Sequence, residues 1–283
     1  MVTTLPTTAI LGAGSMGGAI LAGLLSPDVV VEGGVRVTNR TEAKAVALRR
    51  GPVTSLATET DPTANASAVV GASVVLIGVK PGMVVDLLRE IGPALEPGTV
   101  VVSLAAGVTT ATMEAALPEH VPVLRSMPNT PAVVGLAVTG LAAGSRSSES
   151  DLALARRVFE VVGDVVVVPE EQIDALSTIS GSGPAYVFYL IEQLQEAAVA
   201  LGFTPAQAAT LVQGTFRGAS ELLAASDLLP AAEAPAELRR RVTSPGGTTE
   251  RAVAELADGG LRELFERATQ AALARNREIA AGS

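Results

Sequence analysis

Gly12-Ala13-Gly14-Ser15-Met16-Gly17 is the stretch that decides the fold, because it lies between an apolar strand pattern and a helical pattern. Glycines at this spacing between a strand and a helix are typical of a turn that binds the pyrophosphate of a dinucleotide. Gly12 permits the tight turn, Gly14 lets the backbone approach the pyrophosphate, and Gly17 lets the helix pack closely on the strand. The helix N-terminus adds free N–H groups for the phosphates. The alternative is a glycine-rich turn without a ligand.

The rest of the first 168 residues alternates short β-branched runs with helical patterns, which indicates βαβ units and a largely parallel sheet. The expected strands are Thr8–Gly12, Val35–Asn39, Val74–Val79, Val100–Leu104, Val121–Ser126, Gly135–Ala142 and Asp164–Val168. The expected helices include Met16–Leu25, Thr41–Arg50, Met83–Ile91, Thr109–Ala116 and Glu149–Val162. We therefore predict an α/β fold in which residues 1–168 form a doubly wound, Rossmann-type domain that binds NADP.

After Pro169 no convincing strand pattern remains, and helices are expected at Ile173–Ile179, Pro184–Leu201, Pro205–Ala225, Thr248–Asp258 and Leu261–Ala280. Gly202 is placed as a C-terminal cap, Thr204-Pro205 is placed as an N-cap with the first helical residue, and Leu229–Ala236 is expected to be a flexible connector. The Pro184–Leu201 helix carries only Glu192 and Glu196 as charges, so we expect it to be buried, for example against another subunit. Residues 169–283 are predicted to form an all-helical substrate and dimerisation domain.

Composition narrows the function. The 283 residues include 20 Lys+Arg and 29 Asp+Glu, a formal net charge of −9, which argues against binding to nucleic acid. The chain has no cysteine and one histidine, His120, so disulfides, thiolate catalysis and cysteine-bound zinc are excluded and no metal is expected. No apolar run approaches the roughly 18 residues of a membrane span. A secretion signal has basic residues before its apolar segment, whereas the first basic residue of this chain is Arg36. We expect a soluble, cytoplasmic protein.

The residues that end the second expected strand favour NADP(H) over NAD(H). An NAD-dependent enzyme usually places Asp or Glu there to bind the ribose 2′-hydroxyl. This chain has Thr38-Asn39-Arg40-Thr41, which lacks a carboxylate and offers a guanidinium that suits a 2′-phosphate. The alternative is that Arg40 is an ordinary solvated arginine. The expected cofactor is NADPH, with NADH as the alternative.

Further site candidates lie where later strands end, because these strand ends face the cofactor in such a sheet. Gly78-Val79-Lys80-Pro81 ends one strand, and Ser103 through Gly107 ends the next with small residues that let a ribose and nicotinamide lie close. Arg125 through Pro131 forms a shaped loop, although a structural role for Arg125 is at least as well supported. Lys44 and Lys80 are the only lysines, so any lysine acid chemistry must use one of them. A solvated side chain is the alternative for Lys80.

Two loops in the helical half, Ser180–Tyr186 and Ser244–Thr249, each place small residues before a helix. Exposed N–H groups, hydroxyls and the helix dipole enable such a loop to bind an anion. Each loop alone is explained by an ordinary helix cap. Their occurrence together with a nucleotide domain favours a substrate site.

These motifs, in this order and spacing, closely resemble the pyrroline-5-carboxylate reductase family over essentially the whole chain. The resemblance rests on the glycine-rich turn, Val79-Lys80-Pro81, Ala105-Ala106-Gly107, Arg125 through Pro131 and the two loops, which are the most specific part. It implies NAD(P)H-dependent reduction of 1-pyrroline-5-carboxylate to L-proline, the last step of proline biosynthesis. It also implies a homodimer that is often assembled into a decamer.

The resemblance implies residue roles as well. The cofactor residues would be Gly12, Ala13, Gly14, Ser15, Met16, Gly17, Asn39, Arg40, Asn65, Gly78, Val79, Lys80, Pro81, Ala105, Ala106 and Gly107. Glu170, Thr248 and Thr249 match positions that contact the product, and with Gly246 and Gly247 they form the candidate substrate site. Thr249 and Lys80 are the catalytic candidates. One departure is Arg241, where some members place a cofactor-contacting asparagine, so the role of Arg241 stays open.

The chemistry agrees with reduction of a cyclic imine. The helical half has no His, Lys or Cys, so strong acid–base catalysis is poorly supplied, but the carbon of a protonated imine is already electrophilic. The protein then has to orient the substrate and hold its carboxylate, while the cofactor supplies the hydride. We expect N–H groups at Gly247–Thr249 to bind the carboxylate and the Thr249 hydroxyl to bond the ring nitrogen.

Two other functions compete with this reading. A reductase of the hydroxyacid dehydrogenase type shares the two-domain plan, but it generally uses a lysine on an early helix of the second domain, and this chain has none there. A non-catalytic NADP(H)-binding sensor would need only the nucleotide domain, so the two loops of the helical half argue against it.

Overall fold

The computed structural model describes residues 2–226 and 232–280. The chain separates into two compact units, which we call the N-terminal unit (Met1–Pro184 with Ala272–Ser283) and the helical unit (Ala185–Ala271). Residues 169–184 therefore pack with the N-terminal unit, although the sequence places the division after residue 168. The predicted boundary separates a cofactor domain from a substrate domain, and this functional division stays a prediction.

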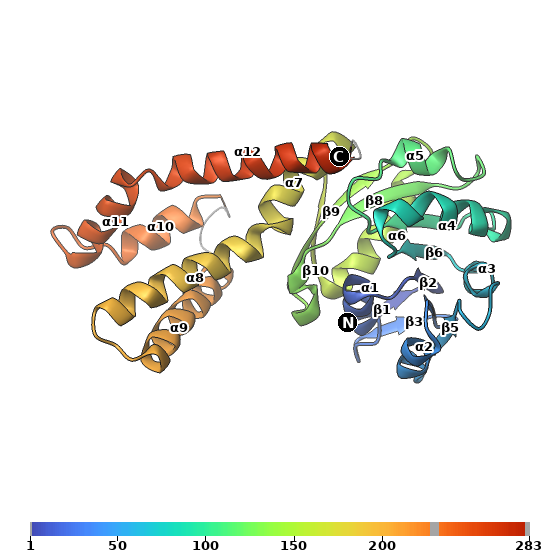
Figure 1. Ribbon diagram of the computed structural model, residues 1–283, viewed down its shortest axis with the longest axis horizontal. Coiled ribbons are helices and arrows are strands. Elements are labelled where there is room, and N and C mark those ends of the chain that lie inside the picture. Colours follow the sequence, from blue (N-terminus) through green and yellow to red (C-terminus); the bar gives the residue numbers. More distant parts are fainter. Residues whose placement is uncertain (1, 227–231, 281–283) are drawn as a thin grey trace. The chain divides into compact units, whose positions relative to one another are not determined.

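An eight-stranded sheet lies at the centre of the N-terminal unit (Figure 1). Its strands follow the order β5-β4-β2-β6-β7-β8-β9-β10. Its strands are β2 (Thr8–Leu11), β4 (Val35–Asn39), β5 (Val53–Ala57), β6 (Val74–Ile77), β7 (Val100–Ser103), β8 (Val123–Met127), β9 (Ala137–Ala143) and β10 (Gly163–Val167). Neighbouring strands run parallel except β8 and β9, which are antiparallel. The order of the strands from β5 to β8 is that of a doubly wound dinucleotide-binding sheet, which confirms the predicted fold class.

Helices cover both faces of this sheet, because alternate side chains of each strand enter different cores. On one face Ile10 packs in a core with α1 (Ser15–Leu24) and α6 (Glu149–Phe159). On the other face Leu11 packs in a core with α3 (Ala64–Val69), α4 (Val84–Ile91) and α5 (Thr110–Glu114). Each fully buried Val, Leu or Ile contributes roughly 1.5–3 kcal/mol. The two cores therefore hold the carboxyl ends of the strands firmly in place.

Several short elements of the N-terminal unit are not predicted from the sequence. β1 (Thr3–Leu5) and β3 (Val29–Val31) form a separate two-stranded sheet, and β5 and α3 complete the first half of the main sheet. α2 (Glu42–Leu48) is predicted and is shorter than expected. Three to six residues carry too few apolar side chains to produce a clear period, so such elements depend on their tertiary contacts.

The helical unit contains most of α8 (Gly183–Ala200), all of α9 (Pro205–Ala224), α10 (Ala234–Arg241) and α11 (Thr248–Asp258), and most of α12 (Leu261–Ala280). The predicted cap of α8 is confirmed, because Gly202 has φ +98°. The predicted start of α9 is confirmed as well. The Thr204 hydroxyl accepts from the Gln207 N–H at 3.3 Å, and Gln207 Oε1 accepts from the Thr204 N–H at 3.0 Å.

Two expectations for this half need correction. The stretch Leu229–Ala236 is not a connector throughout, because its last residues begin α10 with Pro235 in the first turn, where proline is tolerated. Residues 229–231 lie outside the described residues. The expected helix Ile173–Ile179 is also split: α7 covers Ile173–Leu176, and Ser177–Gly181 forms a π-helical turn before α8.

Apolar side chains are exposed along α8. Phe188 is 67% exposed and Tyr189 is 60% exposed in the single chain, and no residue of this helix is buried. This exposure agrees with the expectation that α8 packs against another subunit. In the part of the chain that the structure describes, no helix has the length and apolar character needed to cross a lipid bilayer.

Candidate active site

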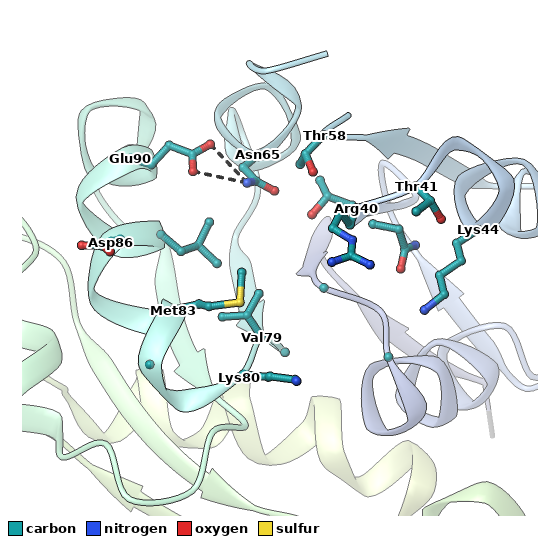
Figure 2. A pocket seen from close by; sticks show the side chains of 17 residues that line it. Arg40, Thr41, Lys44, Thr58, Asn65, Val79, Lys80, Met83, Asp86 and Glu90 are labelled. Atoms are coloured by element: carbon teal, nitrogen blue, oxygen red, sulfur yellow. Dashed lines mark hydrogen bonds between the residues drawn. The ribbon is translucent and has the colours of Figure 1, made fainter. Parts of the chain in front are cut away.

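A cavity of about 700 Å³ lies in the N-terminal unit where β2, β4 and β6 end (Figure 2). Strand order reverses between β2 and β6, and ligands of doubly wound sheets bind at the carboxyl ends of the strands beside such a switch point. The wall includes the glycine-rich turn, the end of β4 and the face of α4.

The glycine-rich turn has the geometry that its sequence predicts. Gly12 has φ +86°, and a Cβ atom there would lie 2.9 Å from Val79 Cγ1. A Cβ atom on Gly17 would lie 3.1 Å from Ile10 Cγ2, so α1 packs closely on β2. A Cβ atom on Gly14 would meet nothing within 4 Å, and Gly14 lines the cavity. The turn is tied to the end of β4, because the N–H groups of Gly12 and Ala13 both donate to the Thr38 carbonyl, at 3.0 and 3.2 Å.

The end of the cavity beside α2 is cationic. Arg40 precedes α2 and Lys44 lies in its first turns, and Figure 2 shows both side chains on the same side of the cavity. Asn39 lines the same end, is 6% exposed, and has an Nδ2 atom without a hydrogen-bond partner among the described residues. A buried donor left unpaired costs roughly 1–3 kcal/mol. An anionic ligand at this end would satisfy the amide and both cations.

The opposite wall combines an apolar strip with acceptors. Val79, Met83 and Leu87 supply the apolar side chains. Asn65 Nδ2 donates to Glu90 Oε1 at 3.1 Å and to Oε2 at 3.4 Å (Figure 2). The cavity thus has a cationic end and an acceptor-rich wall.

A separate polar cluster lies at the end of β8. The Arg125 side chain is 4% exposed, its Nη2 donates to Asp174 Oδ1 at 2.5 Å, and its Nη1 lies 3.7 Å from Glu170 Oε1. Glu170 also accepts from the N–H and the hydroxyl of Thr110, at 2.7 and 2.5 Å. The Glu170 carboxylate therefore caps the start of α5. Arg125 thus has a structural role, as the buried partner of Asp174 and Glu170, which was one of the two roles that the sequence left open.

The Ser244–Thr249 loop lies in the helical unit and opens α11. Gly246 has φ +71°, a conformation that glycine adopts without strain, and Gly247 is the N-cap. The Gly246 N–H donates to Glu250 Oε2 at 2.7 Å, and the Gly247 N–H donates to the Ser244 carbonyl at 2.9 Å. Both threonines of the loop are exposed, and no side chain caps α11.

Arg241 is bound within its own helix. Arg240 Nη2 and Arg241 Nε donate to Glu237 Oε1, at 2.7 and 2.8 Å. These two hydrogen bonds, with that from Arg240 the larger influence, lower the pKa of Glu237 to about 2. Arg241 thus acts in this unit as a partner of Glu237.

The comparison with known proteins starts from two family models. Residues 170–279 match the model described as pyrroline-5-carboxylate reductase dimerisation, and residues 7–107 match the model described as NADP oxidoreductase coenzyme F420-dependent. A pyrroline-5-carboxylate reductase of Corynebacterium melassecola is 38% identical over 277 residues, which cover 96% of this chain and 98% of that protein. The chain belongs to the pyrroline-5-carboxylate reductase family.

Solved structures of pyrroline-5-carboxylate reductases agree with this assignment. The enzyme of Coxiella burnetii is 36% identical, with a TM-score of 0.86 over 96% of this chain and 97% of that one. The pyrroline carboxylate reductase of Plasmodium falciparum, solved with NADP bound, is 22% identical, with a TM-score of 0.77 over 97% of this chain and 98% of that one. At this lower identity the likeness concerns the fold alone.

The family, the oxidoreductase class, the NADP-type nucleotide domain and the helical dimerisation region predicted from the sequence are therefore confirmed. Full-length relatives that are pyrroline-5-carboxylate reductases argue against the hydroxyacid dehydrogenase and the non-catalytic sensor.

Half of the sixteen predicted cofactor residues line the cavity: Gly12, Gly14, Asn39, Arg40, Asn65, Gly78, Val79 and Lys80. Eight others are not part of its lining: Ala13, Ser15, Met16, Gly17, Pro81, Ala105, Ala106 and Gly107. The cofactor roles of all sixteen residues stay predictions. The substrate roles of Glu170 and of Gly246 through Thr249 stay predictions as well. Glu170 lies in the N-terminal unit, and its carboxylate already holds Thr110.

Nine lining residues were not among the predicted cofactor residues: Thr38, Thr41, Lys44, Thr58, Gly82, Met83, Asp86, Leu87 and Glu90. Helical spacing was the available signal. Met83, Leu87 and Glu90 recur at intervals of four and three residues after the strand end, as residues on one helix face do. Lys44 follows Arg40 by four residues.

Proposed function

We propose that this chain reduces 1-pyrroline-5-carboxylate to L-proline with NADPH, the last step of proline biosynthesis. One observation carries the proposal. The glycine-rich turn meets Arg40 and Lys44 in a single cavity, in a chain that aligns over 96% of its length with a pyrroline-5-carboxylate reductase. NADH is the second choice, because the cations at this cavity add binding energy for a 2′-phosphate that NADH lacks.

The residues of the cavity fit NADPH. Gly14 faces open space beside the free N–H groups at the start of α1, which suits a pyrophosphate. The unpartnered Nδ2 of Asn39, with Arg40 and Lys44, suits a 2′-phosphate. When bound, NADPH supplies the hydride.

We assign the substrate carboxylate to the start of α11, where a helix N-terminus attracts negative charge. The N–H groups of Gly246 and Gly247 already have acceptors, so those of Thr248 and Thr249 are left for the carboxylate. The predicted carboxylate site is therefore restricted to the N–H groups in the first turn of α11. Glu170 is a further proposed substrate contact, and its carboxylate also accepts two hydrogen bonds from Thr110.

The Thr249 hydroxyl would hold the ring nitrogen and so orient the imine carbon. A protonated imine already carries the proton that its nitrogen keeps, and the imine carbon gains the hydride, so no side chain has to release a proton in that step. Lys80, exposed where β6 ends and part of the cavity wall, is the second catalytic candidate, because it would donate a proton to the nitrogen of an imine that binds unprotonated.

The proposal extends to assembly and location. A homodimer is the smallest assembly that we propose, supported by the match of residues 170–279 to a dimerisation model and by the apolar side chains on α8. A homodecamer built from such dimers is the largest. A cytoplasmic location accords with a biosynthetic role.

A steady-state assay of the purified full chain tests the proposal. With 1-pyrroline-5-carboxylate and NADPH we expect proline to form in step with NADPH oxidation, at a kcat/KM of roughly 10⁴–10⁸ M⁻¹s⁻¹ as enzymes usually show. A chain that binds NADPH and forms no proline would overturn the substrate assignment and leave a nucleotide-binding protein.

A further inference from the structure

The acceptor-rich wall of the cavity contains an amide that is held in one orientation. Asn65 lies in the first turn of α3 and Glu90 in the last turn of α4. Asn65 Nδ2 donates to both carboxylate oxygens of Glu90, at 3.1 and 3.4 Å, so the amide oxygen points away from Glu90 (Figure 2). The Asn65 oxygen and the Glu90 carboxylate are both acceptors. A ligand in this part of the cavity therefore has to supply hydrogen-bond donors.

The acceptor pair borders a strip that suits a flat ring. Val79 follows β6, and Met83 and Leu87 are four residues apart at the start of α4, on the face that continues to Glu90. A heteroaromatic ring lying on these side chains would present its edge to Asn65 and Glu90. An amino group on that edge would supply the donors.

The charges around the cavity indicate whether the ring on this strip is the adenine or the nicotinamide of a dinucleotide. The cations Arg40 and Lys44 lie at the other end of the same cavity, with Asn39, whose Nδ2 atom has no partner among the described residues. A carboxylate repels a phosphate, so the phosphate belongs with the cations and the donor with Glu90. The 2′-phosphate of NADPH is on the ribose that carries adenine, whereas the nicotinamide lies beyond the pyrophosphate. The ring beside the cationic end is therefore adenine.

We propose that Asn65 and Glu90 recognise the 6-amino group of adenine and make this site selective against 6-oxopurine dinucleotides. The inference rests on the proposed function, because it takes NADPH as the ligand. Glu90 acts twice: it accepts a hydrogen bond from the amine, and it turns the Asn65 oxygen to the ligand. A hypoxanthine ring places a carbonyl oxygen where adenine has its amine. That oxygen would face acceptors only, and unmatched acceptors cost binding energy.

The test compares NADPH with its deaminated analogue, reduced nicotinamide hypoxanthine dinucleotide phosphate, on the full chain. Both carry the same dihydronicotinamide, whose fluorescence reports binding, and the chain has no tryptophan to interfere. We expect the wild-type chain to bind NADPH about tenfold or more tightly than the analogue, the value of one hydrogen bond to a charged group.

Glu90→Gln is the deciding variant. Gln keeps the size of the side chain and can still accept from Asn65, but it then presents an NH2 donor to the ligand. We expect weaker NADPH binding, tighter binding of the analogue, and a ratio of Kd values near one.

Asp86→Asn is the matched control. Asp86 lies on the same helix, lines the same cavity and carries the same charge, but it pairs with Arg89 at 3.4 Å rather than with Asn65. Its loss should shift both affinities together and keep their ratio. Melting temperatures of both variants verify that they are folded.

The possible results separate this inference from the function on which it rests. Equal affinity of the wild-type chain for the two dinucleotides would overturn the inference and leave the reductase assignment intact. A ratio that falls in Asp86→Asn and persists in Glu90→Gln would overturn the assignment to Asn65 and Glu90. A wild-type chain that binds neither dinucleotide would overturn the proposed cofactor, and the inference with it.

Discussion

We expect a preference for NADPH to depend on Arg40 and Lys44, which line the cationic end of the cavity. Arg40→Glu removes one charge-assisted contact, worth about 1.5–3 kcal/mol, and adds repulsion, so NADPH should bind at least tenfold more weakly. NADH affinity should change little, because NADH has no 2′-phosphate. Lys44→Gln should act in the same direction to a smaller extent. Titrations of both dinucleotides measure this. Arg50→Gln, an exposed arginine outside the cavity, is the control, and equal losses for NADPH and NADH in Arg40→Glu would contradict the assignment.

A variant of Thr249 distinguishes between two roles of this residue, a substrate contact and a helix cap. The sequence left both roles open, but Gly247 is the N-cap of α11 and no side-chain hydrogen bond caps that helix. Thr249→Ala should therefore leave the melting temperature nearly unchanged, whereas loss of a true cap costs about 1 kcal/mol. It should lower kcat/KM for 1-pyrroline-5-carboxylate roughly tenfold or more, since each 1.4 kcal/mol is a factor of ten.

Steady-state kinetics, thermal melting and an NADPH titration on the same variant check this prediction. NADPH affinity should stay close to that of the wild-type chain, because the residues assigned to the cofactor lie in the N-terminal unit. An unchanged kcat/KM with a lowered melting temperature would mean that Thr249 is a cap and that the substrate binds elsewhere.

The residues of the cavity could be predicted from the sequence where a local pattern marks them. Gly12 and Gly17 are glycine for reasons that the turn itself imposes, and the structure shows both close contacts. Lys44 and Glu90 are marked only by a helical spacing from Arg40 and Met83, which does not by itself identify a site. They reach the cavity because α2 and α4 pack on the sheet at particular angles, and the sequence does not display that packing directly. Glu170 shows the converse, because its match to a motif did not reveal that Thr110 and Arg125 already hold its carboxylate.

At the scale of the element, α8 predicts the oligomeric state. Its large apolar side chains are exposed in the single chain, with Phe188 67% and Tyr189 60% accessible, and residues 170–279 match a dimerisation model. Burying such a face against a second copy removes apolar surface from water at about 25 cal/mol per Å². Light scattering at micromolar concentration should show a dimer or a larger assembly. A monomer that still forms proline would contradict this role of α8.

Long, regular elements were predicted well, and short ones were not. α11 and α12 have the bounds expected from their helical period, and the buried strands β2, β6 and β7 were recognised as apolar runs. β5 and α3 were not predicted, because neither the edge strand with its exposed Thr54 nor the six-residue helix shows a clear hydrophobic period in the sequence. α10 escaped for another reason. Its alanines and Pro235 suggest a loop, whereas its three last residues are arginines, two of which bind Glu237.

At the scale of the whole chain, we assign different parts of one reaction to the two units. The N-terminal unit contains the cavity assigned to NADPH, and the helical unit contains the α11 start assigned to the substrate carboxylate. Neither unit offers a histidine or cysteine for the chemistry beyond His120, which lies in a loop between α5 and β8. Such a chain suits a reaction in which orientation of the substrate matters more than proton transfer by a side chain.

The most direct test of the central claim follows the hydrogen that is transferred. Incubation of the full chain with 1-pyrroline-5-carboxylate and NADPH deuterated at the transferred position of the nicotinamide, followed by mass spectrometry of the product, measures where that hydrogen goes. We predict proline with one deuterium, located on the former imine carbon. Proline without deuterium, or oxidation of NADPH without proline, would contradict direct hydride transfer from NADPH to the imine by this chain.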